Sequence, residues 1–140
     1  MKNLILLFLF AAIFSPLKLY SQENDHPIDK QLSACYEKNP STAGMVNCIN
    51  EAFEKWDALL NKCYKLLIAK LDEESAKALK SAESEWIAYK EKEINFIDKM
   101  YSTKEGTMYI PMRAYSIMNI TKTRALELEG YCSDNDISTK

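Results

Sequence analysis

The chain has 140 residues, of which 47% are hydrophobic and 27% are charged, and its formal net charge is −2. Its 20 Asp and Glu side chains outnumber its 18 Lys and Arg side chains. This mildly acidic balance argues against a nucleic-acid-binding protein, which needs clustered basic side chains. Only 3 Gly and 4 Pro occur, so few turns are needed and the secondary-structure elements should be few and long.

The first 21 residues have the layout of an export signal. Lys2 supplies a positive charge, an apolar run extends from Leu4 to Phe14, and the small residue Ser21 precedes a polar segment. The run is shorter than the roughly 20 residues of a membrane-spanning helix, so a retained anchor is the less favoured alternative. No cysteine lies near the cleavage point to carry a lipid. We therefore predict a signal peptide over residues 1–21, a periplasmic or secreted protein and no stable membrane anchor.

Cleavage after Ser21 would leave 119 residues, enough for one small domain. The signal contains two lysines and no acid, so the mature chain would keep 16 basic and 20 acidic side chains, a charge of −4. Residues 22–30 are mostly polar and predict a flexible arm. His26, the only histidine, lies in this arm, where a histidine is more often incidental than catalytic.

A short helix over residues 31–39 and a long helix over about residues 43–71 are predicted next. Pro40 separates them, because the residue before a proline disfavours helical geometry, and Ser41 or Thr42 can cap the long helix. Apolar residues then recur at steps of three and four, which indicates one buried face. They are Met45, Cys48, Ala52, Trp56, Leu59, Cys63, Leu66 and Leu67.

A second long helix is predicted from its cap, Asp72, to residue 100 or 101. Its apolar stripe includes Trp86 and Tyr89. This aromatic pair could bind a ligand, although packing in the core is the simpler interpretation at helical spacing. A loop over residues 102–110 follows, with Gly106 inside it.

Pro111 suits the first position of a third long helix, which would run to about Gly130, a residue type that can terminate helices. Arg124 lies in this helix and would anchor a carboxylate of the preceding one. Residues 133–140 are polar and predict a flexible tail. No β-type alternation occurs, so the expected fold class is all-α: an antiparallel three-helix bundle with a short N-terminal helical appendage.

Four cysteines behind an export signal predict a disulfide-stabilised domain. Cys35 and Cys48 flank the Pro40 turn, and closing this loop of about 14 residues contributes about 3 kcal/mol through chain entropy. In the expected bundle the end of the third long helix lies near the second half of the first, so Cys63 and Cys132 are the second predicted pair. The alternative is a buried free thiol at Cys63 and a free or intermolecular thiol at Cys132.

The sequence offers little for catalysis. A nucleophile needs a neighbouring base, and His26 is badly placed to act as one. Neither CxxC nor HExxH, the usual zinc-binding spacings, is present. Carboxylate neighbours such as Glu73 and Glu74 are typical of solvated helix surfaces. We therefore predict a protein that is not an enzyme and needs no metal or cofactor.

Three helical motifs in a fixed order resemble a known family. They are Leu60-Asn61-x2-Tyr64-x2-Leu67, Ala82-x3-Trp86-Ile87-Ala88-Tyr89-Lys90-Glu91 and Ile120-Thr121-x2-Arg124-x3-Leu128. Together with Cys35 and Cys48 they are similar to the LprI-type lysozyme inhibitor family of exported bacterial proteins. The resemblance implies that residues 31–132 form an LprI-like helical domain.

The resemblance also implies a protein partner, a lysozyme, which the chain would bind and block without chemistry of its own. The alternative is an envelope protein-interaction or scaffold module with another partner. An acidic inhibitor would be attracted to a basic lysozyme. The Ser102–Tyr109 loop is the candidate blocking segment, with Glu105, Met108 and Tyr109 as candidate partner contacts. The competing interpretation is that this loop only joins two helices. The lysozyme class and the oligomeric state stay open.

The chain departs from the family pattern at three positions. Relatives usually have cysteines where this chain has Ile94 and Ser116. Both cysteines are absent together, as expected if one disulfide between the second and third long helices was lost. Cys63 and Cys132 are then extra and could restore a covalent tie by another route. Lys90 stands where relatives often carry arginine, which puts a bidentate contact there in doubt.

Overall fold

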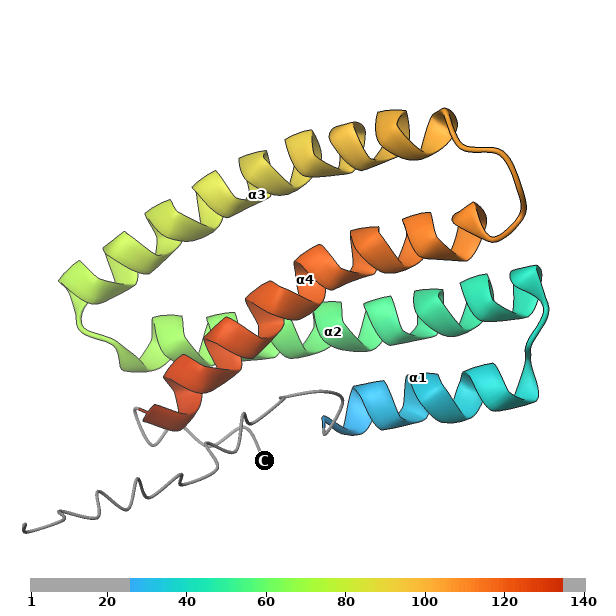
Figure 1. The fold of residues 1–140 in the computed structure, drawn as a ribbon. Coiled ribbons are helices and arrows are strands. Elements are labelled where there is room, and N and C mark those ends of the chain that lie inside the picture. Colours follow the sequence, from blue (N-terminus) through green and yellow to red (C-terminus); the bar gives the residue numbers. More distant parts are fainter. Residues whose placement is uncertain (1–25, 135–140) are drawn as a thin grey trace, which may run out of the picture.

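The computed structural model describes residues 26–134. Over this range the chain is all-α, as predicted, and contains four helices (Figure 1). They are α1 (Pro27–Lys38), α2 (Thr42–Lys70), α3 (Glu73–Ser102) and α4 (Tyr109–Asp134). None of the helices in this range is both long enough and apolar enough to span a bilayer. The predicted signal peptide, residues 22–25 of the predicted arm and residues 135–140 of the predicted tail lie outside the described residues.

Helix α1 begins at Pro27, earlier than predicted, so the flexible arm is wrong for residues 26–30. The Nδ1 atom of His26 accepts a hydrogen bond of 3.2 Å from the backbone N–H of Ile28 and caps the helix. Ile28 and Leu32 are buried in the core, and Asp29 is buried in an ion pair of 2.8 Å with Lys122 of α4. Contacts with the other helices therefore hold in place a segment whose polar composition had predicted a flexible arm.

Helices α2 and α3 begin at the side-chain caps that the sequence indicated. Ser41 Oγ accepts a hydrogen bond of 3.0 Å from the N–H of Gly44, and Asp72 Oδ1 accepts one of 2.9 Å from the N–H of Ser75. Hydrogen bonds from the backbone and the hydroxyl of Ser75 hold the pKa of Asp72 below its usual value. Both helices therefore start where a short polar side chain satisfies an otherwise unpaired backbone donor.

Helix α4 is longer than predicted at both ends. It begins at Tyr109, so Pro111 is its third residue, and it continues through Gly130 to Asp134. The predicted termination at Gly130 is wrong because Cys132, two residues further on, is fully buried. Packing of this last turn outweighs the modest cost of a glycine inside a helix.

The helices pack unevenly. Helices α2 and α4 run in the same direction and form the main packed pair, while α1 lies along α2. Helix α3 runs the opposite way and diverges from them over much of its length (Figure 1). The connected core draws its buried members from α1, α2 and α4, and Leu79 and Trp86 of α3 pack against its edge. Only Ala76, Glu83 and Ile97 of α3 are buried, so α3 contributes less to the core than a regular three-helix bundle requires.

One of the two predicted disulfides is present. Cys35 and Cys48 are bonded, with their Cα atoms 5.8 Å apart, and the bond ties α1 to α2 across the Pro40 turn. The predicted Cys63–Cys132 bond is absent from the structure, which has both residues as buried free thiols. The predicted proximity is nevertheless found, because the thiol of Cys132 donates to the backbone carbonyl of Cys63 at 3.6 Å. This hydrogen bond gives the buried thiol of Cys132 a partner, and both cysteines match the alternative of free thiols.

We expect both thiols to be unreactive in the folded protein. Burial, followed by the neighbouring Cys132, raises the pKa of Cys63 to about 12, and alkylating reagents attack the thiolate. Iodoacetamide at about pH 8 should add no mass to the native protein. In denaturant without reductant it should add two carbamidomethyl groups, one for each free cysteine. An unfolded chain that resists alkylation would instead reveal a bond between the two sulfurs.

Candidate functional site

The α3–α4 loop, residues 103–108, lies at the same end of the molecule as the α1–α2 turn (Figure 1). Gly106 has a φ of 107°, which residues with a Cβ rarely adopt, and its carbonyl accepts a hydrogen bond of 3.3 Å from the N–H of Tyr109. Glu105 is exposed, and Met108 is 61% exposed. Tyr109 is half-buried, with its ring centroid 6.4 Å from that of Tyr101. The side chains of Glu105 and Met108 are therefore more exposed to solvent than that of Tyr109.

An apolar groove of about 490 Å³ adjoins the loop. It is termed the loop-end groove, and it is lined by Tyr36, Met45, Ile49, Tyr101, Met108, Pro111, Met112, Tyr115 and Ser116. These residues come from all four helices and the loop. Burial, with a smaller effect of Tyr115, raises the pKa of Tyr36, so its hydroxyl stays protonated. A concave apolar surface with a few hydroxyl groups suits the apolar side chains of a partner.

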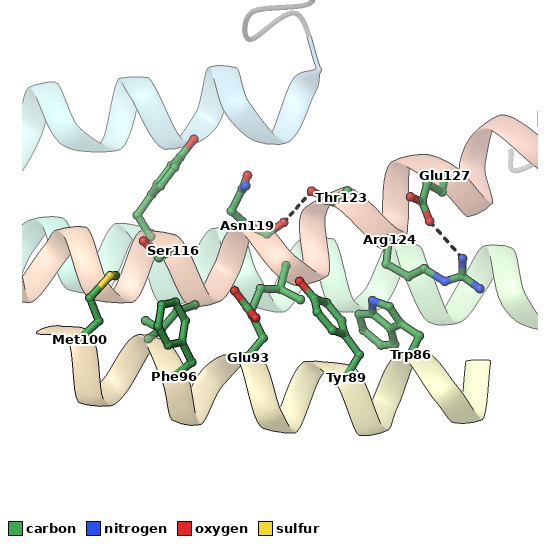
Figure 2. A pocket seen from close by; sticks show the side chains of 13 residues that line it. Trp86, Tyr89, Glu93, Phe96, Met100, Ser116, Asn119, Thr123, Arg124 and Glu127 are labelled. Atoms are coloured by element: carbon green, nitrogen blue, oxygen red, sulfur yellow. Dashed lines mark hydrogen bonds and ion pairs between the residues drawn. The ribbon is translucent and has the colours of Figure 1, made fainter. Parts of the chain in front are cut away.

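A second groove, of about 620 Å³, runs between α3 and α4 (Figure 2). It is termed the α3–α4 groove and exists because α3 diverges from α4. Helix α3 supplies Trp86, Tyr89, Glu93, Phe96, Ile97 and Met100, and helix α4 supplies Tyr115, Ser116, Asn119, Ile120, Thr123, Arg124 and Glu127. Tyr89 is 52% exposed and Phe96 is 57% exposed. The prediction that Tyr89 belongs to a buried stripe is therefore wrong, since α4 lies too far away to cover it.

Arg124 closes one end of the α3–α4 groove. Its guanidinium binds Glu83 of α3 at 2.9 Å and Glu127 of α4 at 3.0 Å. Burial disfavours the charged guanidinium, but the hydrogen bonds that it donates to Glu127 and Glu83 outweigh this effect and raise the pKa of Arg124. Glu83 is thus the carboxylate of the preceding helix that Arg124 was expected to anchor. The pair holds α3 to α4, which is a structural role.

Trp86 lies beside this ion pair and is half-buried. Lys90 Nζ lies 5.2 Å from the Trp86 ring and 5.5 Å from the ring of Phe53 in α2. Lys90 therefore links α3 to α2 through cation–π contacts, which need no bidentate geometry.

His26 has a structural position that the sequence did not reveal. Its ring centroid lies 4.4 Å from that of Trp56, and its Nε2 lies 3.6 Å from a carboxylate oxygen of Glu129. Within residues 26–134, no group of three or more His, Cys, Asp or Glu side chains could hold a metal ion.

Sequence reasoning did not find either groove. Glu93 and Phe96 of α3 face Asn119 of α4 across a groove only because the two helices diverge at a particular angle. The signal that could have pointed to the α3–α4 groove is the mixed stripe of α3, where Glu93 interrupts an otherwise apolar and aromatic row. An acid at a predicted core position indicates that the position is open to water or to a partner.

Comparison with known proteins gives one family and one described fold neighbour. The family model for "Lysozyme inhibitor LprI" matches residues 33–128. No curated protein matches the chain. The crystal structure of an uncharacterized protein from Burkholderia thailandensis has a TM-score of 0.73 with 26% sequence identity, covering 78% of this chain and 55% of that one. The present chain thus spans little more than half the length of that protein.

Proposed function

The chain belongs to the LprI lysozyme inhibitor family, and from this membership we propose that it is an exported protein that binds a lysozyme and blocks its cleft without chemistry of its own. The observation that carries the proposal is the extent of the family match, which begins in α1 and ends in α4. The matched region therefore includes the α3–α4 loop and both grooves.

The α3–α4 loop is proposed as the blocking segment. A glycosidase cleft is concave and contains two catalytic carboxylates, so a blocker has to project a convex segment that tolerates negative charge nearby. Met108 supplies exposed apolar surface at the edge of the loop-end groove. Glu105 would pair with a basic side chain at the rim of the cleft, because the catalytic carboxylates would repel it from the interior.

The purified protein is expected to slow the lysis of bacterial cell walls by a basic lysozyme at micromolar concentration or below. Met108→Ala and Glu105→Gln should each raise the inhibitory concentration about tenfold, which corresponds to about 1.4 kcal/mol of binding free energy. Matched controls are Ile87→Ala, an exposed apolar residue on α3, and Glu74→Gln, an exposed acid at the far end of α3. Turbidity of a cell-wall suspension measures the rate. Full lysis by every lysozyme class, with the Cys35–Cys48 bond intact, would rule the proposal out.

The second candidate is an envelope protein-interaction or scaffold module. The α3–α4 groove favours it, because this larger groove runs along two helices and not at the loop. Capture of partners from envelope extract and from host fluid distinguishes the two candidates. A variant with the loop replaced by a short glycine-rich turn should lose its partner if the chain is an inhibitor and keep it if the chain is a module of the second kind.

A further inference from the structure

The α3–α4 groove holds a carboxylate, with no partner among the described residues, between two exposed aromatic rings. Figure 2 shows Glu93 on α3 with Phe96 on one side and Tyr89 on the other, all pointing from α3 toward α4. We propose that this part of the groove binds a basic side chain of a protein partner, and arginine in preference to lysine. The proposal rests on the proposed function only for the identity of the protein that supplies that side chain.

The spacing on α3 brings the three groups together. Glu93 follows Tyr89 by four residues and precedes Phe96 by three, and side chains at these spacings are neighbours on one helix face. Tyr89 and Phe96 are both more than half exposed. Two ring faces and a carboxylate are thereby presented on one side of a rigid helix, with open space in front of them.

The charge of Glu93 is not compensated within the described residues 26–134. Its side chain is half-buried, and no hydrogen bond or ion pair engages it there, whereas Glu83 and Glu127 at the end of the groove share Arg124. Lys90, one turn away on α3, lies instead over Phe53 and Trp86. A carboxylate that has lost part of its water without gaining a partner is stabilised by an incoming cation.

The chemistry of the groove selects among possible occupants. An anion would be repelled by Glu93, and a wholly apolar segment would bury the carboxylate without compensation. A guanidinium satisfies both kinds of group at once, because it stacks on aromatic faces and binds a carboxylate through two parallel hydrogen bonds. Asn119 on the opposite wall can accept a further N–H through its side-chain carbonyl.

A second copy of this chain is a poor source of that arginine. The chain has two arginines, and both are in ion pairs: Arg113 with Asp98 at 2.7 Å and Arg124 with Glu83 at 2.9 Å. A basic protein of another kind, which the acidic net charge of this chain would attract, supplies free arginine more readily.

The direct test uses N-acetyl-arginine amide as the probe and isotope-labelled protein observed by NMR. The amide signals of Tyr89, Glu93, Phe96 and Asn119 should shift together, with at least about threefold tighter binding than for N-acetyl-lysine amide. Glu93→Gln should weaken the binding of the arginine probe at least about fivefold, and Tyr89→Ala should weaken it as well. Glu91→Gln, the same change at an exposed position of α3, should leave it unchanged. Scattered shifts, or equal binding to wild type and Glu93→Gln, would overturn the proposal.

The lysozyme assay separates this inference from the proposed function. If wild type blocks a lysozyme and Glu93→Gln raises the inhibitory concentration at least about fivefold, the groove contributes to that interface. If wild type blocks no lysozyme but binds the arginine probe at Glu93, the proposed function fails and the groove inference stands. Inhibition unaffected by Glu93→Gln, together with no localised arginine binding, leaves the proposed function standing and removes the groove inference.

Discussion

Replacing Trp56 by alanine is expected to destabilise the protein by about 3–5 kcal/mol, the largest single effect among the core positions. Trp56 is 0% exposed and joins three elements at one place. His26 packs on its ring with centroids 4.4 Å apart, and Lys122 Nζ lies 5.5 Å above it. Alanine would remove the ring against which the start of α1 and the middle of α4 both pack. Urea denaturation followed by circular dichroism measures the change in the free energy of unfolding.

Trp56→Phe is the matched control for this variant. The indole Nε1 of Trp56 has no hydrogen-bond partner among the described residues, so phenylalanine keeps most of the ring and loses no hydrogen bond. Its cost should be below about half of that of alanine. A loss below about 1.5 kcal/mol for Trp56→Ala would show that the surrounding helices collapse into the space, and that α1 is not held through this ring.

Replacing Arg124 by alanine should cost about 3 kcal/mol or more, because it leaves the carboxylate of Glu83 buried without a partner. The side chains of Glu83 and Arg124 are only 10% and 11% exposed. Helix α3 has few other buried anchors, so hydrogen exchange should accelerate along α3 more than along α2. Chemical denaturation and amide hydrogen exchange measure the two effects separately.

Two further variants identify the cause of that loss. Glu127, the other partner of Arg124, has a side chain that is 50% exposed. Glu127→Gln should therefore lower the free energy of unfolding by less than about 1 kcal/mol. The double variant Arg124→Leu with Glu83→Leu removes both charges and should recover much of the stability lost in Arg124→Ala. A double variant as unstable as Arg124→Ala would assign the loss to side-chain packing and not to the unpaired charge.

Local signals in the sequence were sufficient for most of the fold. The all-α class, the caps at Ser41 and Asp72, the Cys35–Cys48 bond and the loop around Gly106 each depend on residues close together in the chain. Such features follow from backbone hydrogen bonding and chain geometry, which neighbouring residues determine.

The features that the sequence did not predict depend on contacts between distant segments. The early start of α1 needs Asp29 to meet Lys122, and the continuation of α4 past Gly130 needs Cys132 to be buried beside Cys63. The α3–α4 groove depends on the angle at which α3 leaves the core. Periodicity marked Tyr89 as facing inward, and it does face α4, but periodicity cannot tell how far away the neighbouring helix lies.

The Cys35–Cys48 bond joins two helices that each contribute to the loop-end groove. The residue that follows each cysteine, Tyr36 in α1 and Ile49 in α2, lines this groove together with Met108. The crosslink thereby restrains the spacing of these two residues of the groove wall, and it forms only on oxidation. A newly made chain in a reducing cytoplasm would lack this crosslink, and an oxidising compartment would allow it to form. The final spacing of this wall would thus depend on the compartment in which the disulfide forms.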